Sequence, residues 1–166
     1  MLGDRPRPRI TASGSRDAAY RDFSRSLADD PDTFPVLLVD SEDPVPVGKS
    51  AAAFLRDRDS WTNPLPEEQV HLMVQCMEAW FLADRATLTQ YYGDNFRDTA
   101  LPGNPKIEEV LKNDLLDGLA RATETTSKKR YHKTRHGFDI LERLDPYSVQ
   151  QRSPFARALF AVLLRR

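Results

Sequence analysis

The sequence predicts an α/β fold: a small, mostly parallel sheet with flanking helices, followed by a helical C-terminal extension from about residue 105. Two short apolar runs predict the strands. Residues 36–39 are consecutive Val and Leu between Pro35 and Pro44, and residues 70–77 form a second run. Unbroken runs of this kind are typical of strands buried on both faces, which occur in parallel sheets covered by helices. Beyond residue 105, apolar residues recur at helical spacing.

Length and composition limit the class of protein. The chain has 166 residues, 40% of them hydrophobic and 30% charged, which suits one folded domain. Because 24 Lys and Arg nearly balance 25 Asp and Glu, any contact with nucleic acid must come from a local basic patch. Cys76 is the one cysteine, so an intramolecular disulfide is excluded. With no apolar signal-peptide core or membrane span in the sequence, we expect a cytoplasmic protein.

The first half of the chain alternates between expected helices and strands. We expect residues 1–8 to form a flexible basic leader, because arginines and prolines alternate there. A single domain is expected over residues 9–166. It would open with a short strand at 9–12, a helix at 17–28, the strand at 35–39 and a helix at 48–58.

The second half begins with the strand at 70–77, which leads directly into a predicted helix at 78–92. Gly93 suits the position just after that helix, and Pro105 suits the first position of the next one. Residues 137–144 and 153–164 are expected to form two closing helices.

Three acids follow the first strand: Asp40, Glu42 and Asp43. In parallel sheets, ligands bind beyond the carboxyl ends of the strands. If the strand continues, Asp40 and Glu42 point to one side and Asp43 to the other. Neighbouring carboxylates are costly to bury without a cation, so a divalent-metal site is one interpretation. An equally good interpretation is that these acids are solvated loop residues or helix N-caps.

Glu78 follows the second apolar run in the same way. If the two strands are neighbours, Glu78 reaches the same edge of the sheet as Asp40. Carboxylate oxygens are the ligands that Mg²⁺ prefers. The alternative for Glu78 is an ordinary acid in the first turn of a helix, and Asp84 is expected to be a surface charge.

Two basic regions are candidates for phosphate binding. Ser15 and Arg16 lie in a glycine-containing turn at a helix start, although an ordinary capped turn is the better explanation of these residues taken alone. Residues 128–136 contain five Lys or Arg, two His and one Tyr, with no acid. Such a segment suits a phosphate backbone or simply a solvated loop. Its candidate contacts with nucleic acid are Lys128, Lys133, Arg135 and His136.

Residues 37–42, 70–84 and 131–138 resemble a bacterial family, domain of unknown function 4276 (DUF4276). That family looks like a divergent branch of the Toprim superfamily, whose Rossmann-like α/β domain binds metal in topoisomerases, primases and nucleases. The resemblance implies that Asp40 and Glu42 replace the Toprim Asp-x-Asp pair. It also implies Mg²⁺ or Mn²⁺ as cofactor and cleavage of phosphodiester bonds. We expect Asp40 and Glu42 to be the catalytic metal ligands, with Glu78, from its place at the sheet edge, as a further one.

The resemblance has two further implications. Relatives begin with an additional strand, ending in Glu-Gly, and a helix; nothing before Arg9 resembles them, so we expect this strand, its glutamate and the helix to be missing. Relatives also resemble partners of AAA- or ABC-type ATPases in phage defence. The alternative function is therefore an inactive accessory subunit that binds an ATPase through its apolar C-terminal residues, namely Leu141, Leu144, Phe155, Leu159, Phe160, Leu163 and Leu164.

Overall fold

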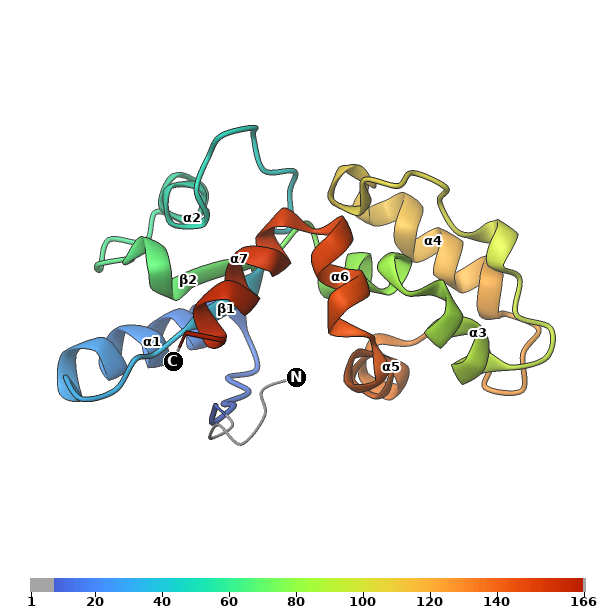
Figure 1. The fold of residues 1–166 in the computed structure, drawn as a ribbon, viewed down its shortest axis with the longest axis horizontal. Helices are drawn as coiled ribbons and strands as arrows, with labels where there is room; N and C mark the ends of the chain where they lie inside the picture. Colours follow the sequence, from blue (N-terminus) through green and yellow to red (C-terminus); the bar gives the residue numbers. More distant parts are fainter. Residues whose placement is uncertain (1–7, 166) are drawn as a thin grey trace.

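The structure of the chain is a computed structural model that describes residues 8–165. Most of the expected basic leader, residues 1–7, lies outside the described residues. The fold is mixed α/β, with helices dominating and a two-stranded parallel sheet in one half of the molecule (Figure 1). The predicted α/β class and the helical C-terminal half are therefore confirmed.

The sheet is a strand–helix–strand unit. Strand β1 (Leu37–Asp40) pairs in parallel with β2 (Val70–Met73), so that Asp40 lies opposite Met73. Helix α2 (Ala51–Asp59) makes the crossover that two parallel strands require. Backbone pairing continues past both strands, because the amide of Ser41 donates to the carbonyl of Met73 at 3.0 Å. The chain segments that leave β1 and β2 therefore stay side by side.

Helices cover both faces of this sheet. Helix α1 (Arg16–Asp29) and α2 supply Phe23, Phe54 and Leu55 to a core that also holds Leu37 and Val39. Helix α7 (Pro154–Leu163) packs against β2. In Figure 1, α7 crosses in front of the sheet, next to α6 and on the side of the helical half.

A second hydrophobic core lies within the helical half. Its helices are α3 (Arg85–Tyr92), α4 (Lys112–Thr123), α5 (Phe138–Arg143), α6 (Pro146–Arg152) and α7, joined by short 3-10 and π turns. Leu159 of α7 belongs to this core, whereas Phe155 packs against the first one. Helix α7 thus links the two cores. None of the described helices combines the length and apolar character that crossing a bilayer requires.

The structure corrects three of the expected elements. Residues 9–12 form no strand, and Ile10 is 89% exposed, so this segment has no packed neighbour. Strand β2 ends at Met73 rather than residue 77. The predicted helix at 78–92 is two helices, the 3-10 helix Met77–Ala83 and α3. They are separate because Asp84 is the N-cap of α3: its carboxylate accepts a hydrogen bond from the Thr87 amide at 3.1 Å.

Two further differences concern helix starts. Pro105 does not begin a helix: a 3-10 turn, Ile107–Glu109, follows it, and α4 begins only at Lys112. Helix α6 was not predicted; its cap is Asp145, whose carboxylate accepts from the Ser148 amide at 3.0 Å. The predicted start of α7 at Ser153 and Pro154 is confirmed.

The start of α7 is tied to the turn before α4 by partly buried hydrogen bonds. The hydroxyl of Ser153 accepts from the Ala156 amide at 3.0 Å, which caps the helix. The same hydroxyl donates to Oε1 of Glu108 at 2.5 Å, and the Phe155 amide donates to that oxygen at 3.2 Å. Burial raises the pKa of Glu108, while these donors act in the opposite direction.

Replacing Ser153 by Ala removes the cap and one donor to the Glu108 carboxylate. We expect the free energy of unfolding to fall by about 1–2 kcal/mol in urea titration. Gln151→Ala, an exposed change two residues away on α6, is the control and should change this free energy by less than about 0.5 kcal/mol. Equal effects of the two substitutions would contradict this role of Ser153.

Candidate functional site

The carboxyl ends of β1 and β2 bring two acids together. Asp40 is the last residue of β1, and Glu78 lies in the first turn of the 3-10 helix that follows β2. Oδ1 of Asp40 accepts from the Met77 amide at 2.8 Å, which joins the end of one strand to the segment after the other. Glu78 is 1% exposed. The expectation that Glu78 reaches the same edge as Asp40 is confirmed.

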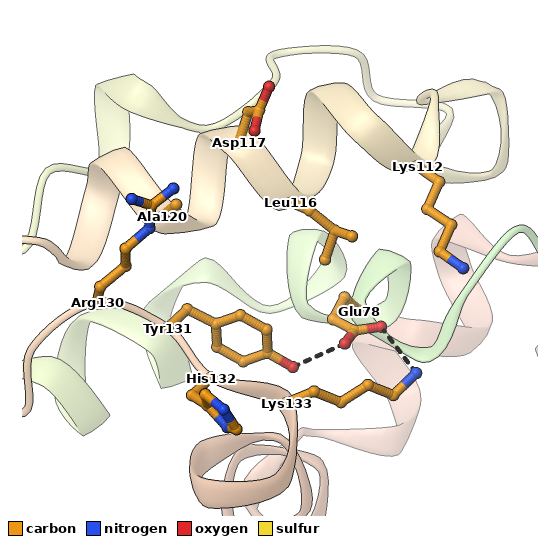
Figure 2. A pocket seen from close by; sticks show the side chains of 9 residues that line it. All are labelled: Glu78, Lys112, Leu116, Asp117, Ala120, Arg130, Tyr131, His132 and Lys133. Atoms are coloured by element: carbon orange, nitrogen blue, oxygen red, sulfur yellow. Dashed lines mark hydrogen bonds and ion pairs between the residues drawn. The ribbon is translucent and has the colours of Figure 1, made fainter.

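One lysine lies between these two carboxylates. Nζ of Lys133 is 3.1 Å from Oδ2 of Asp40. The same nitrogen is 3.7 Å from Oε2 of Glu78, as Figure 2 shows. The hydroxyl of Tyr131 donates to the other oxygen of Glu78, Oε1, at 2.8 Å. Within the described residues, Oε2 of Glu78 has no hydrogen-bond partner although it is buried. Two partly or fully buried carboxylates therefore share a single cation.

The protonation states follow from burial and from these neighbours. Burial raises the pKa of Asp40 and outweighs Lys133, which lowers it, while Glu78 and Glu42 raise it further. Burial acts to lower the pKa of Lys133, but the carboxylates of Asp40 and Glu78 outweigh it and raise this pKa. Lys133 therefore stays protonated, and ionised Asp40 is costly to the folded state.

Two neighbouring groups stay neutral. Burial, followed by the charge of Glu78, raises the pKa of Tyr131, so the phenol remains a hydrogen-bond donor. Burial also raises the pKa of Cys76 to about 12, and the charge of Glu78 adds to that effect. A buried thiol of this kind is not a nucleophile at neutral pH.

Glu42 does not point the way that simple alternation along a strand predicts. The strand ends at Asp40, and Glu42 has a backbone φ of 67°, so the chain turns there. The side chain of Glu42 pairs with Lys112 of α4. Asp43 pairs instead with Arg58, at 2.7 Å. The acid that shares a cation with Asp40 is therefore Glu78, and not Glu42.

A pocket of about 360 Å³ opens beside the acids. Helix α4 forms one side of it, and residues 130–133 of the basic segment form the other (Figure 2). The structure thus brings the acidic edge of the sheet and part of the basic segment together. The lining residues are Glu78, Lys112, Leu116, Asp117, Ala120, Arg130, Tyr131, His132 and Lys133.

The other candidate residues of the basic segment lie outside this pocket. Lys128 Nζ lies 4.9 Å from the centre of the Tyr91 ring, and Arg135 is exposed. His136 is only 4% exposed, and its Nδ1 accepts from the His132 amide at 3.2 Å. Burial, aided by the charge of Arg135, lowers the pKa of His136. The π turn Lys133–Gly137 therefore places Lys133 at the acids and His136 in the protein interior.

Ser15 and Arg16 also lie away from the pocket. The hydroxyl of Ser15 accepts from the Ala18 amide at 3.2 Å, as in an ordinary capped helix. Arg16 pairs with Asp59 at 2.5 Å, and its guanidinium lies 5.6 Å from the centre of the Trp61 ring. These contacts hold the start of α1 against the end of α2.

Asp40 and Glu78 are the two carboxylates at this edge that a divalent cation could bind. No group of three or more His, Cys, Asp or Glu side chains in the described part of the chain could hold a metal ion. Mg²⁺, however, is commonly bound through one or two carboxylates, with water and substrate phosphate as the other ligands. The buried Oε2 of Glu78, without a hydrogen-bond partner, is an oxygen suited to such a cation. Binding would require Lys133 to move aside.

Of the residues that line this pocket, only Glu78 and Lys133 were candidates from the sequence; Tyr131 and Lys112 are among those that were missed. The sequence shows Tyr131 only as the aromatic residue of the basic segment, and Lys112 belongs to no recognisable motif. The apolar C-terminal residues expected to contact an ATPase are largely in the cores: Leu144 and Leu159 are buried, and Phe155 and Leu163 pack against buried residues.

Replacing Asp40 by Asn should stabilise the protein at pH 7. Because the pKa of Asp40 is raised in the folded state, wild-type stability falls as pH rises above the ordinary Asp pKa of about 3.9. The amide cannot ionise, and its oxygen can still accept from Met77. We expect urea titrations to show a more stable variant at pH 7 and a difference that shrinks as pH falls toward 4.

The exposed change Asp94→Asn is the control for this experiment and should alter stability by less than about 0.5 kcal/mol at either pH. A variant Asp40→Asn that is less stable than the wild type at pH 7 would show that the pair with Lys133 outweighs burial.

A family model identifies the relatives of the chain. No curated protein and no solved structure matches the chain. The family model described as domain of unknown function (DUF4276) matches residues 5–164, nearly the whole sequence. That match covers both strands, the acids at their ends and the basic segment. The chain therefore belongs to the DUF4276 family.

Proposed function

We propose that this protein is a Toprim-like nuclease that cleaves phosphodiester bonds in nucleic acid with Mg²⁺ or Mn²⁺. One observation carries the proposal: Asp40 at the end of β1 and Glu78 in the turn that follows β2 share Lys133, and Glu78 and Lys133 line a pocket that holds further cations. Acids at the carboxyl edge of a parallel sheet are where this architecture places ligand sites. Cations beside them suit the phosphates of a substrate.

Each residue then has a defined part in the reaction. Asp40 and Glu78 would hold the metal ion, which when bound would activate water and neutralise charge on the phosphate. The Met77 amide fixes the orientation of Asp40, and the Tyr131 hydroxyl fixes that of Glu78. Lys133 stays protonated, so on leaving the carboxylates it can pair with a phosphate oxygen. Lys112, on the opposite side of the pocket, is a second cation in reach of the substrate.

The accessory-subunit alternative makes the opposite prediction for this site. A subunit that only binds an ATPase has no need of paired acids beside a cationic pocket, and it would show no metal-dependent cleavage. The apolar residues that suggested such a role are mostly used inside the protein.

The cleavage proposal is tested with purified protein, Mg²⁺ or Mn²⁺, and labelled single- and double-stranded DNA resolved on denaturing gels. We expect cleavage that EDTA abolishes. Asp40→Asn and Glu78→Gln should each lower the rate by about 100-fold or more, since each removes a carboxylate that would hold the metal ion. Both variants should also bind Mn²⁺ more weakly than the wild type in calorimetric titration.

Asp43→Asn is the matched control, because Asp43 follows Asp40 by three residues but pairs with Arg58. The cleavage rate of this variant should stay within about twofold of the wild-type rate. If the wild-type protein binds Mn²⁺ but cuts no DNA, or if all three variants cut equally well, the nuclease proposal is wrong.

A further inference from the structure

We infer that the pocket beside the acids is a slot for one unpaired nucleotide, so that the protein selects single-stranded over double-stranded nucleic acid. This inference rests on the proposed function and names its substrate class. It is carried by the arrangement of charged and apolar side chains along the pocket (Figure 2).

One long side of the slot is a single face of α4. Lys112, Leu116 and Ala120 recur every four residues and therefore lie along one side of the helix. At the helical rise they span about 12 Å. Figure 2 shows Lys112 at the end near Glu78 and Ala120 at the end near Arg130. The face thus changes from charged, beside the acids, to apolar, farther away.

The opposite side of the slot offers an aromatic ring. Tyr131 lines the pocket, with its hydroxyl fixed on Glu78 at 2.8 Å. Phe81 meets the ring edge-on, with ring centroids 6.1 Å apart, so the ring is held in place. Bases of any sequence pack against such rings, which is how proteins that bind single strands gain affinity without reading sequence.

The charges fix the direction of the nucleotide. Its phosphate belongs at the end with Lys112, Lys133 and the buried Oε2 of Glu78, because the acids there would hold the metal. Its base then lies against Tyr131, Leu116 and Ala120. Lys112 and Lys133 are already paired with acids, whereas Arg130 is exposed and forms no ion pair within the described part of the chain. Arg130 is therefore available for the next phosphate.

The size of the slot suits one nucleotide. About 360 Å³ is near the lower limit for ligand pockets, and α4 faces residues 130–133 across it. A base within a duplex could enter only after leaving its stack, which costs free energy that an unpaired base does not need. Single-stranded segments are thus the substrate class that this geometry favours.

The test measures binding in the Asp40→Asn variant, which should not cleave. Fluorescence anisotropy in Mg²⁺ compares a labelled 12-nucleotide single strand with the same sequence as a blunt duplex. We expect the single strand to bind about tenfold more tightly or better. Adding Arg130→Glu should weaken single-strand binding by about tenfold. Adding Lys129→Glu, the same charge change on an exposed neighbour that does not line the pocket, should weaken it by less than about threefold.

A second variant, Leu116→Trp, fills the slot from α4 and should weaken single-strand binding while leaving duplex binding within about twofold. Equal affinity for both DNAs, equal effects of the two charge changes, or no DNA binding at all would overturn the inference. If duplex DNA is cleaved as fast as single-stranded DNA, and the Arg130→Glu variant is as active as the wild type, the slot inference is wrong but the nuclease proposal still holds. Selective single-strand binding without any cleavage would support the slot and refute the nuclease proposal.

Discussion

The parallel pairing of β1 with β2 is the constraint on which the site depends. Because Asp40 lies opposite Met73, the two strands end together, and the chain leaves both on the same side of the sheet. The Ser41 and Glu42 amides, which donate to Met73 and Gln75, keep the two exits together. Only this register lets the Met77 amide meet Asp40 and lets Glu78 share Lys133 with it. A shift of one residue would send Asp40 to the other face.

The site is electrostatically unfavourable for the folded protein, and its neighbours show how the protein compensates. Asp40 and Glu78 bring two acids into a partly or fully buried space, with Lys133 between them and a tyrosine hydroxyl on one oxygen. One oxygen of Glu78 has no hydrogen-bond partner within the described residues. Carboxylates of this kind lower stability. Such a cost is common at functional sites, where activity limits how stable the surrounding fold can be.

Local patterns predicted the fold better than they predicted the geometry of the site. The apolar run ending at Asp40 predicted β1, and the parallel-sheet rule placed Glu78 beside it. The direction of the Glu42 side chain was predicted wrongly, because the sequence gives no sign of a positive φ at a residue other than glycine. His136 looked like a phosphate ligand because a charged segment gives no sign of the π turn that buries it. Lys112 could be found only by folding, since it reaches Glu42 across 70 positions.

The two sides of the pocket come from different parts of the fold. The acids belong to the sheet edge, whereas the apolar face of Leu116 and Ala120 belongs to α4, which begins after a separate 3-10 turn. Substitutions on that helix face can therefore reshape what the pocket accepts without moving Asp40 or Glu78. In the proposed nuclease, chemistry and selectivity would in this sense be modular: related chains could diversify their ligands through α4 while keeping the two acids.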